Sequence, residues 1–293
     1  MHDSQTCIGR FAPSPTGPLH FGSLYTALAS FLHTRSQQGL WRLRIDDLDT
    51  PRNVNGSDTS ILTTLEAFGL EWDGEVYYQS QHLDDYEQAL NVLRQHDCLY
   101  PCTCSRSMLT TTIYPGKCRH KHFPEHAPHA LRVKTDQRVI RFVDALQGEM
   151  TYPLDQQGDF ILKRKDGIIA YQFAVVLDDY SQQVNEVVRG FDLLESTPRQ
   201  IYLQQILGLP TPRYWHVPII VDAQGFKLSK QTLATAVDVN APATVLFELL
   251  SLLKQNPPLE LRNAAVVELL DWGIAHWNPA ALKTLQSLSR SPV

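Results

Sequence analysis

Residues 7–49 alternate between the patterns typical of strands and of helices. The segment CIGRFAPSP (7–15) predicts a short strand that ends at two prolines, and LHFGSLYTALASFLHTRS (19–36) carries apolar residues at helical spacing. The apolar segment GLWRLRIDDLD (39–49) predicts a second strand. Because a helix between two consecutive strands is the usual crossover of a parallel sheet, we expect an α/β fold.

The alternation continues along the chain. Helical patterns follow at TSILTTLEAFGL (59–70), DDYEQALNVLRQHD (84–97) and STPRQIYLQQILGL (196–209). The segment DFILKRKDGIIAYQFAVVLDD (159–179) holds two apolar runs joined by Asp166-Gly167, which predicts a hairpin whose second strand is buried on both faces. The last part of the chain predicts two or three amphipathic helices, interrupted at Pro257-Pro258.

Cysteines are concentrated in one turn-rich segment. Cys102, Cys104 and Cys118 lie in CTCSRSMLTTTIYPGKC, which interrupts the alternation of strands and helices. The chain has five cysteines, an odd number, and no secretory pattern at its start, which disfavours disulfides and favours thiolate ligands of a metal. A structural zinc site usually has four ligands, and His120 or His122 would complete a Cys₃His set; the alternative is a group of unliganded buried thiols.

Charge and hydropathy limit the partners. The net charge of −5 argues against a surface that coats nucleic acid, but residues 117–141 hold seven Lys and Arg against Glu125 and Asp136. This segment is either a phosphate-binding surface or a solvated basic face without a partner. Because no apolar run approaches about 18 residues, we expect no membrane span and a cytoplasmic protein.

Two loops carry residues suited to phosphate chemistry. A helix N-terminus presents unpaired N–H groups and a positive dipole end to an anion, and His20 and Gly22 lie where the first predicted helix begins. Glycine permits close approach of the backbone, and histidine can donate to a phosphate oxygen. Lys227 and Lys230 lie in the loop GFKLSKQ (225–231), where a lysine charge suits a polyphosphate. Either loop alone would be an ordinary surface feature.

Together the two loops resemble the signature segments of the class I aminoacyl-tRNA synthetases, and specifically of the glutamyl branch. RFAPSPTGPLHFGS (10–23) is similar to the HIGH region of that branch, and KLSKQ (227–231) to its KMSKS loop. LRIDDLDTPR (43–52), AYQFAVVLDD (170–179) and EVVRGFDLLESTPRQ (186–200) extend the resemblance to about residues 8–232. The resemblance implies ATP-dependent formation of an aminoacyl-adenylate, followed by acyl transfer to RNA.

The family's architecture implies a Rossmann-type parallel-sheet catalytic domain with a small zinc-containing insertion and a short C-terminal helical region. On this pattern, residues 1–98 form the first half of the catalytic domain and residues 99–155 the inserted zinc subdomain. Residues 156–236 form the second half with the KLSKQ loop, and residues 237–293 a helical region without an anticodon-binding domain.

The resemblance also implies the site residues. Those placed in catalysis are His20 and Lys230. Those placed at ATP, which brings Mg²⁺ with it, are His20, Gly22, Ser23, Lys227, Ser229 and Lys230. Those placed at glutamate are Arg10, Phe11, Ala12, Pro13, Ser14, Asp46, Tyr171 and Arg189. The last set has guanidinium groups for two carboxylates and a carboxylate for the ammonium group.

Two positions depart from the family pattern. Ser23 stands where the general HIGH motif has a second histidine, and its hydroxyl can still donate a hydrogen bond. Asp46 stands where the family usually has glutamate. Its side chain is one methylene shorter, and a water molecule or a small backbone shift could bridge it to the α-ammonium group of the substrate.

The cysteine segment resembles a short glutamyl-Q branch of the family, in which a C-x-C pair, a tyrosine and a further cysteine bind one structural zinc ion. In this sequence that set is Cys102, Cys104, Tyr114 and Cys118. The branch implies activation of glutamate without tRNA, and its transfer to the queuosine base in the anticodon of tRNA(Asp), by a monomeric enzyme. The alternatives are a truncated synthetase that charges a tRNA 3′ end and a non-catalytic RNA-binding paralogue.

Overall fold

Parallel strands form the central layer of the computed structural model, which describes residues 6–105, 108, 113–124, 127–222, 224–225 and 237–289. One ladder joins β1 Ile8–Phe11, β2 Leu40–Ile45 and β3 Tyr77–Tyr78, and a second joins β9 Glu186–Gly190 to β10 Arg213–Val217. The ladders meet where Asn185 N donates to Ile8 O at 3.0 Å and Ile8 N donates to Asn185 Oδ1 at 2.8 Å. The resulting order, β3–β2–β1–β9–β10, confirms the predicted α/β fold.

The helices match most of the predicted segments. The α-helices are α1 Phe21–Arg35, α2 Ser57–Ala67, α3 Leu83–Gln95, α4 Tyr171–Ser181, α5 Thr197–Leu207, α6 Pro242–Leu252 and α7 Val266–Ala275. Short 3-10 helices are η1 Thr50–Arg52, η2 Gln79–His82, η4 Leu154–Gln156, η5 Phe191–Ser196, η7 Leu259–Asn263 and η8 Pro279–Leu282. The helices predicted at 19–36, 59–70, 84–97 and 196–209 are α1, α2, α3 and α5, and the tail helices are α6 and α7. Within the described ranges, no helix has both the length and the apolar character needed to cross a membrane.

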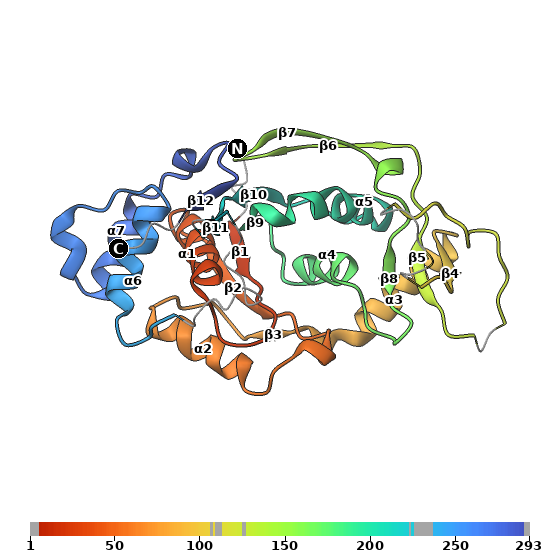
Figure 1. Ribbon diagram of the computed structural model, residues 1–293, viewed down its shortest axis with the longest axis horizontal. Coiled ribbons are helices and arrows are strands. Elements are labelled where there is room, and N and C mark those ends of the chain that lie inside the picture. Colours follow the sequence, from red (N-terminus) through yellow and green to blue (C-terminus); the bar gives the residue numbers. More distant parts are fainter. Residues whose placement is uncertain are drawn as a thin grey trace.

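Smaller sheets flank the central layer. The antiparallel strands β4 Leu99–Cys102, β5 Ala130–Val133 and β8 Ile161–Lys163 form one sheet with β5 in the middle. The hairpin of β6 Val139–Asp144 and β7 Gly148–Pro153 and the parallel pair of β11 Ile219–Val221 with β12 Ser287–Ser289 are separate. Figure 1 shows β4, β5 and β8 at one end of an elongated molecule, α6 and α7 at the other, and the β6–β7 hairpin along α5.

The prediction of a strand in the second half of residues 159–179 is wrong. The Asp166-Gly167 turn does form, because Arg164 N donates to Ile168 O at 2.8 Å and Lys163 makes an antiparallel bridge with Ile169. The chain then enters α4 at Tyr171 instead of continuing as a strand. Because α4 contacts α3, α5 and β8, it buries apolar residues on several sides, and such a run lacks the periodicity that separates a buried helix from a buried strand.

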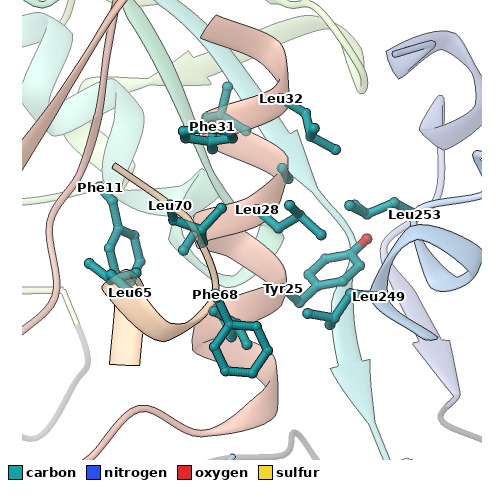
Figure 2. Close-up of a cluster of buried hydrophobic side chains, with 14 of the residues drawn as sticks. Phe11, Tyr25, Leu28, Phe31, Leu32, Leu65, Phe68, Leu70, Leu249 and Leu253 are labelled. Carbon is teal, nitrogen blue, oxygen red and sulfur yellow. The ribbon is translucent and has the colours of Figure 1, made fainter. Parts of the chain in front are cut away.

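One hydrophobic core surrounds α1 (Figure 2). Side chains from β1, α2 and the turn after α2 cover one part of the helix, namely Phe11, Leu65, Phe68 and Leu70. Leu249 and Leu253, within and just after α6, cover another part. Gly273 lets α7 approach closely, since a Cβ there would lie 3.0 Å from Leu250 Cδ2 and 3.1 Å from Leu32 Cδ2. The tail helices therefore complete the core around α1.

Leu249→Ala tests this role of α6. The Leu249 side chain is fully buried, so its truncation should leave a cavity and lower the free energy of unfolding by about 2–5 kcal/mol. Urea unfolding followed by tryptophan fluorescence measures the change. The control is Val267→Ala on α7, whose side chain is 61% exposed and which should change the free energy of unfolding by less than about 0.5 kcal/mol. Equal effects of the two substitutions would contradict the packing.

Candidate active site

A cavity opens at the carboxyl ends of the central strands. It has a volume of about 300 Å³ and is bordered by the loop after β1, by Asp46 after β2 and by the end of β9. The first residues of α1 and α4 complete its border. The carboxyl ends of parallel strands are the usual ligand site of an open α/β sheet, and this position makes the cavity the candidate active site.

Most site residues predicted from the sequence meet at this cavity. Those that line it are Arg10, Phe11, Ala12, Pro13, Ser14, His20, Gly22, Ser23, Asp46, Tyr171 and Arg189. The remaining predicted residues, Lys227, Ser229 and Lys230, lie outside the described residues. The described residues that flank this segment lie at or next to the cavity. Ile220, which precedes it, lines the cavity. The backbone N of Val237, which follows it, donates at 3.2 Å to the carbonyl of Leu19, another lining residue.

The N-terminus of α1 presents an anion-binding arrangement. His20 is the N-cap: Ser23 N donates to its Nδ1 at 3.2 Å, and Ser23 Oγ lies 2.9 Å from its Nε2. Ser23, which replaces the second histidine of the general motif, therefore holds the ring of the first. The first turn of α1 carries no acidic residue, so the positive end of the helix dipole faces the cavity without a competing carboxylate on the helix.

A buried arginine connects three segments beside the cavity. Arg44 on β2 is fully buried, and its Nε lies 2.7 Å from Asp46 Oδ1. Its Nη1 lies 2.7 Å from Asp179 Oδ1 on α4, and its Nε lies 3.8 Å from Asp178 Oδ2. Arg10 on β1 reaches the same Asp179 oxygen, with Nε at 3.2 Å. One carboxylate thus holds two guanidinium groups from neighbouring strands.

These contacts separate the pKa values of neighbouring carboxyl groups. Burial raises the pKa of Asp46 to about 6, and the charge of Arg44 offsets only part of that effect. Burial acts on Asp179 as well, but Arg10 and Arg44 hold its pKa below the usual value. Burial raises the pKa of Asp178, which accepts hydrogen bonds from Tyr86 Oη and Gln79 Nε2, both at 2.6 Å. Asp179 therefore stays ionised at neutral pH, and Asp46 titrates nearer to neutrality.

Arg44 and Asp179 are absent from the set predicted from the sequence. Both lie in segments that resemble the family, and a physical signal was present. Arg44 and Asp46 stand two residues apart on a strand and so point to the same face of the sheet. Asp179 ends a long apolar run, where a buried carboxylate requires a cationic partner.

Arg189 and Tyr171 form another part of the cavity lining. Arg189 lies on β9, next to the strand that carries Arg10, and its Nη1 is 3.5 Å from Tyr171 Oη. Arg189 is buried, whereas the Tyr171 side chain remains exposed. Arg10, Arg189 and Asp46 place two cations and one anion in the cavity lining, which also includes Arg44 and Asp192. This arrangement complements a small molecule with two carboxylates and one ammonium group.

The cysteines meet at the end of β4. The sulfur atoms of Cys102, Cys104 and Cys118 all lie within 4.8 Å of one another. Tyr114 Oη lies 3.3 Å from Cys102 Sγ and 3.6 Å from Cys104 Sγ. His120 is exposed, as is His122, and within the described residues no histidine belongs to this group. Among the described residues, the structure thus brings Tyr114, and not a histidine, to the sulfur atoms.

Charged residues attach the cysteine group to the antiparallel sheet. Cζ of Arg132 on β5 lies 3.9 Å from the centre of the Tyr114 ring, and its Nη1 donates to Asp159 O at 2.8 Å. Arg119, next to Cys118, donates to the Asp159 carboxylate, which also accepts from Tyr100 Oη on β4 at 2.5 Å. Asp159 therefore links the chain around Cys118 to β4.

Comparisons with known proteins agree on one set of relatives. A model of the family "tRNA synthetases class I (E and Q), catalytic domain" matches residues 7–245. The glutamyl-Q tRNA(Asp) synthetase of Ectopseudomonas mendocina is 46% identical and covers 97% of each chain, and that of Aromatoleum aromaticum is 48% identical over 92% of this chain and 89% of its own. A solved glutamate tRNA ligase from Elizabethkingia meningosepticum, in complex with its amino acid, has a TM-score of 0.83 at 23% identity, over 98% of this chain and 67% of that chain. This last likeness shows a shared fold.

Asp179→Asn tests the shared carboxylate. The substitution keeps the shape of the side chain but leaves Arg10 and Arg44 with a buried charge that has lost a partner, so the free energy of unfolding should fall by about 3 kcal/mol or more. Chemical denaturation at neutral pH measures the loss. Asp166→Asn is the control, because Asp166 pairs with Arg164 at the surface, and it should leave the unfolding midpoint unchanged. Wild-type stability in Asp179→Asn would contradict the assignment.

Proposed function

Because this chain belongs to the class I (E and Q) tRNA synthetases, and among them to the glutamyl-Q tRNA(Asp) synthetases, we propose that it activates L-glutamate with ATP and transfers it to the queuosine base in the anticodon of tRNA(Asp). The activation step needs no tRNA, and Mg²⁺ accompanies ATP. The observation that carries the proposal is the single cavity in which residues 10–14, the start of α1, Asp46, Tyr171 and Arg189 come together.

Glutamate occupies the part of the cavity with the paired charges. Among the described residues, Arg10 donates through Nε to Asp179 and through Nη1 to Val188 O at 3.5 Å, which leaves Nη2 for a carboxylate of the substrate. Arg189 Nη1 and Tyr171 Oη receive the other carboxylate. The hydrogen bonds among the described residues engage only Oδ1 of Asp46, so Oδ2 is available to the α-ammonium group, directly or through water.

ATP places its phosphates at the N-terminus of α1. His20 and the backbone near Gly22 and Ser23 provide the contacts there, and Lys227, Ser229 and Lys230 supply the second set. The flanking residues support the placement of these three residues at ATP. Ile220 precedes their segment and lines the cavity, and Val237 follows it and donates to Leu19 in the loop before α1. A polyphosphate would thus be held from two segments that are distant in the sequence.

The reaction requires positioning more than covalent help from the protein. The α-carboxylate oxygen of glutamate attacks the α-phosphorus of ATP, a new P–O bond forms, and the bond to the bridging oxygen breaks as pyrophosphate leaves. His20 and Lys230 stabilise the negative charge that develops on the phosphoryl oxygens. In the second step a nucleophile of the queuosine base attacks the acyl carbon of the adenylate, and AMP leaves.

We also propose that Cys102, Cys104, Tyr114 and Cys118 bind one structural zinc ion. Tetrahedral zinc with Zn–S bonds of about 2.3 Å spaces its sulfur ligands about 3.8 Å apart. The 3.6 Å between Cys104 Sγ and Cys118 Sγ fits that spacing, as do the contacts of Tyr114 Oη with two of the sulfur atoms. Zinc would cross-link a polar segment that has few apolar contacts of its own. Lys117 and Lys121 beside it are exposed to solvent, where they are available to RNA phosphates.

The division of the chain at residues 98, 155 and 236 stays a prediction, as do the monomeric state and the cytoplasmic location. Two packing features bear on the division. β8 pairs with β5, which joins the segment after residue 156 to the one before it, and α6 shares the core of α1. The units proposed from the sequence therefore contact each other through ordinary secondary structure.

Two measurements test the function. Purified protein should support glutamate-dependent exchange between ATP and pyrophosphate in the absence of RNA, and no exchange would reject the proposal in favour of a non-catalytic RNA-binding paralogue. Labelled glutamate should then be transferred to tRNA(Asp) that contains queuosine and not to tRNA(Asp) that lacks it. Transfer that ignores the modified base, or that is lost when the 3′-terminal adenosine of the tRNA is removed, would instead indicate a truncated synthetase that charges the 3′ end.

Substitutions at the cysteine group test the zinc proposal. Elemental analysis should find one zinc per chain in the wild type, a loss of zinc in Cys104→Ser, and weaker retention against a chelator in Tyr114→Phe, since each removes a ligand. His120→Ala should keep the wild-type zinc content, because His120 lies outside the group. Cys104→Ser should weaken transfer to RNA more than exchange of pyrophosphate. A full zinc content in Cys104→Ser, or its loss in His120→Ala, would overturn the ligand set.

A further inference from the structure

A fully buried histidine stands behind Arg189. His216 on β10 is the register partner of Arg189 on β9, so the two residues lie directly opposite each other in the parallel ladder. Arg189 Nε donates to His216 Nε2 at 3.0 Å. The other ring nitrogen, His216 Nδ1, lies 2.5 Å from Oδ2 of Asp144, a buried carboxylate at the end of β6. The contacts form a chain from Asp144 through His216 to Arg189.

The partners determine where His216 carries its proton. A guanidinium group has donors and no acceptor, so Arg189 Nε requires an unprotonated Nε2 on the ring. The ring proton therefore lies on Nδ1 and is donated to Asp144. Burial lowers the pKa of His216 to about 4, an effect that Asp144 opposes and Arg189 reinforces, and the ring is neutral at physiological pH. Asp144 Oδ1 is itself fixed by Leu146 N at 3.0 Å and Gln147 N at 2.9 Å.

The remaining contacts of Arg189 leave one edge of its guanidinium group for a ligand. Arg189 Nη2 donates to Thr197 Oγ1 at 2.8 Å and lies 3.4 Å from Leu193 O. Thr197 Oγ1 is also 3.2 Å from His216 Nε2, so Thr197 contacts both Arg189 and the histidine that holds it. Nη1 is the nitrogen left beside Tyr171 Oη at the cavity.

Arg10 and Arg189, which both line the cavity, are held in different ways. Arg10 is ion-paired with Asp179. None of the ion pairs among the described residues includes Arg189, which is oriented instead by a neutral imidazole and a hydroxyl group. A carboxylate in the place of His216 would fix the guanidinium group equally well, but it would compete with a substrate carboxylate for the same charge. The neutral acceptor fixes the direction of Arg189 and leaves its charge for the ligand.

We propose that Asp144 and His216 are positioning residues for glutamate: Asp144 holds His216 in the tautomer that accepts from Arg189, and His216 thereby holds Arg189 Nη1 and Tyr171 Oη in place for one substrate carboxylate. The inference rests on the proposed function of the cavity. It assigns to the β6–β7 hairpin, through Asp144, a direct influence on amino-acid binding.

Glutamate-dependent exchange of pyrophosphate tests the inference through the KM values of the two substrates. In Asp144→Asn the shape is kept, but the amide in the place of Oδ2 becomes a donor to Nδ1, which moves the ring proton to Nε2, where it opposes the Arg189 donor. His216→Leu removes the acceptor. Each should raise the KM for glutamate by about tenfold or more, the usual effect of losing a hydrogen bond to a charged group, while the KM for ATP changes by less than about twofold.

His216→Gln provides the conservative variant, because its amide can donate to Asp144 and accept from Arg189, and it should recover most of the glutamate affinity. The matched control is His33→Leu: His33 is also buried beside a carboxylate, with Nε2 3.4 Å from Glu186 Oε2, but it does not line the cavity. This control should leave the KM for glutamate unchanged even where it lowers stability. The four variants share one assay, and their folded fractions are read from thermal unfolding.

Three outcomes overturn the inference. The first is an unchanged KM for glutamate in folded Asp144→Asn, the variant that should disturb folding least because it keeps the shape of the side chain. The second is an equal rise of the KM values for glutamate and ATP in Asp144→Asn and His216→Leu, because that pattern indicates general damage to the cavity. The third is a wild-type protein that shows no glutamate-dependent exchange, which rejects the proposed function together with the inference. With active wild-type protein, failure of the inference and failure of the function are separate results.

Discussion

The fully buried guanidinium group of Arg44 is the constraint on which the site depends. A buried cation is tolerated only with charged or hydrogen-bonding partners, and Arg44 has Asp46 just after its own strand and Asp178 and Asp179 on α4. The need to satisfy it brings α4 against the end of β2. Because Asp179 also holds Arg10, the same requirement places a second guanidinium group at the cavity. Removing one partner of such a buried network leaves an uncompensated charge, so its members depend on one another.

The carboxyl groups around Arg44 have separate roles because their surroundings differ. Asp179 lies between two guanidinium groups and remains an anion of the scaffold. Asp46 has one such partner, and burial raises its pKa to about 6, so it is the carboxylate whose ionisation a bound ammonium group would favour most. Asp178 accepts from two tyrosines and a glutamine and so belongs to the interior. Of these three neighbouring acids, Asp179 is a structural anion, Asp46 is the one at the cavity, and Asp178 is a buried acceptor.

Local patterns in the sequence predict the α/β class of the fold, and the resemblance of its motifs to a family predicts most of the residues that line the cavity. The alternation of apolar runs gives β1, α1 and β2, and the first loop can only lie at the carboxyl end of β1. Long-range partners were not predictable in the same way. The strand expected after Asp166-Gly167 is α4, because its burial is decided by the neighbouring helices and β8. Asp144 and His216 were missed because each acts through a residue that is distant in the sequence, and their own neighbours carry no signal of that contact. For Arg44, the nearby Asp46 is a local signal, but the contact with Asp179 on α4 is not.

The part of the chain after residue 236 supports the cavity on two sides. The buried flank of α1 packs against Leu249 and Leu253, so the helix whose N-terminus borders the cavity is held in place from α6. Ile219 and Ile220, which also line the cavity, are held in β11 by its parallel pairing with β12 near the end of the described chain. Thr284 N further donates at 3.0 Å to Leu146 O, two residues after Asp144. Because these contacts hold α1 and the wall beside it, the shape of the cavity depends on α6 and β12 as well as on the loop that carries His20.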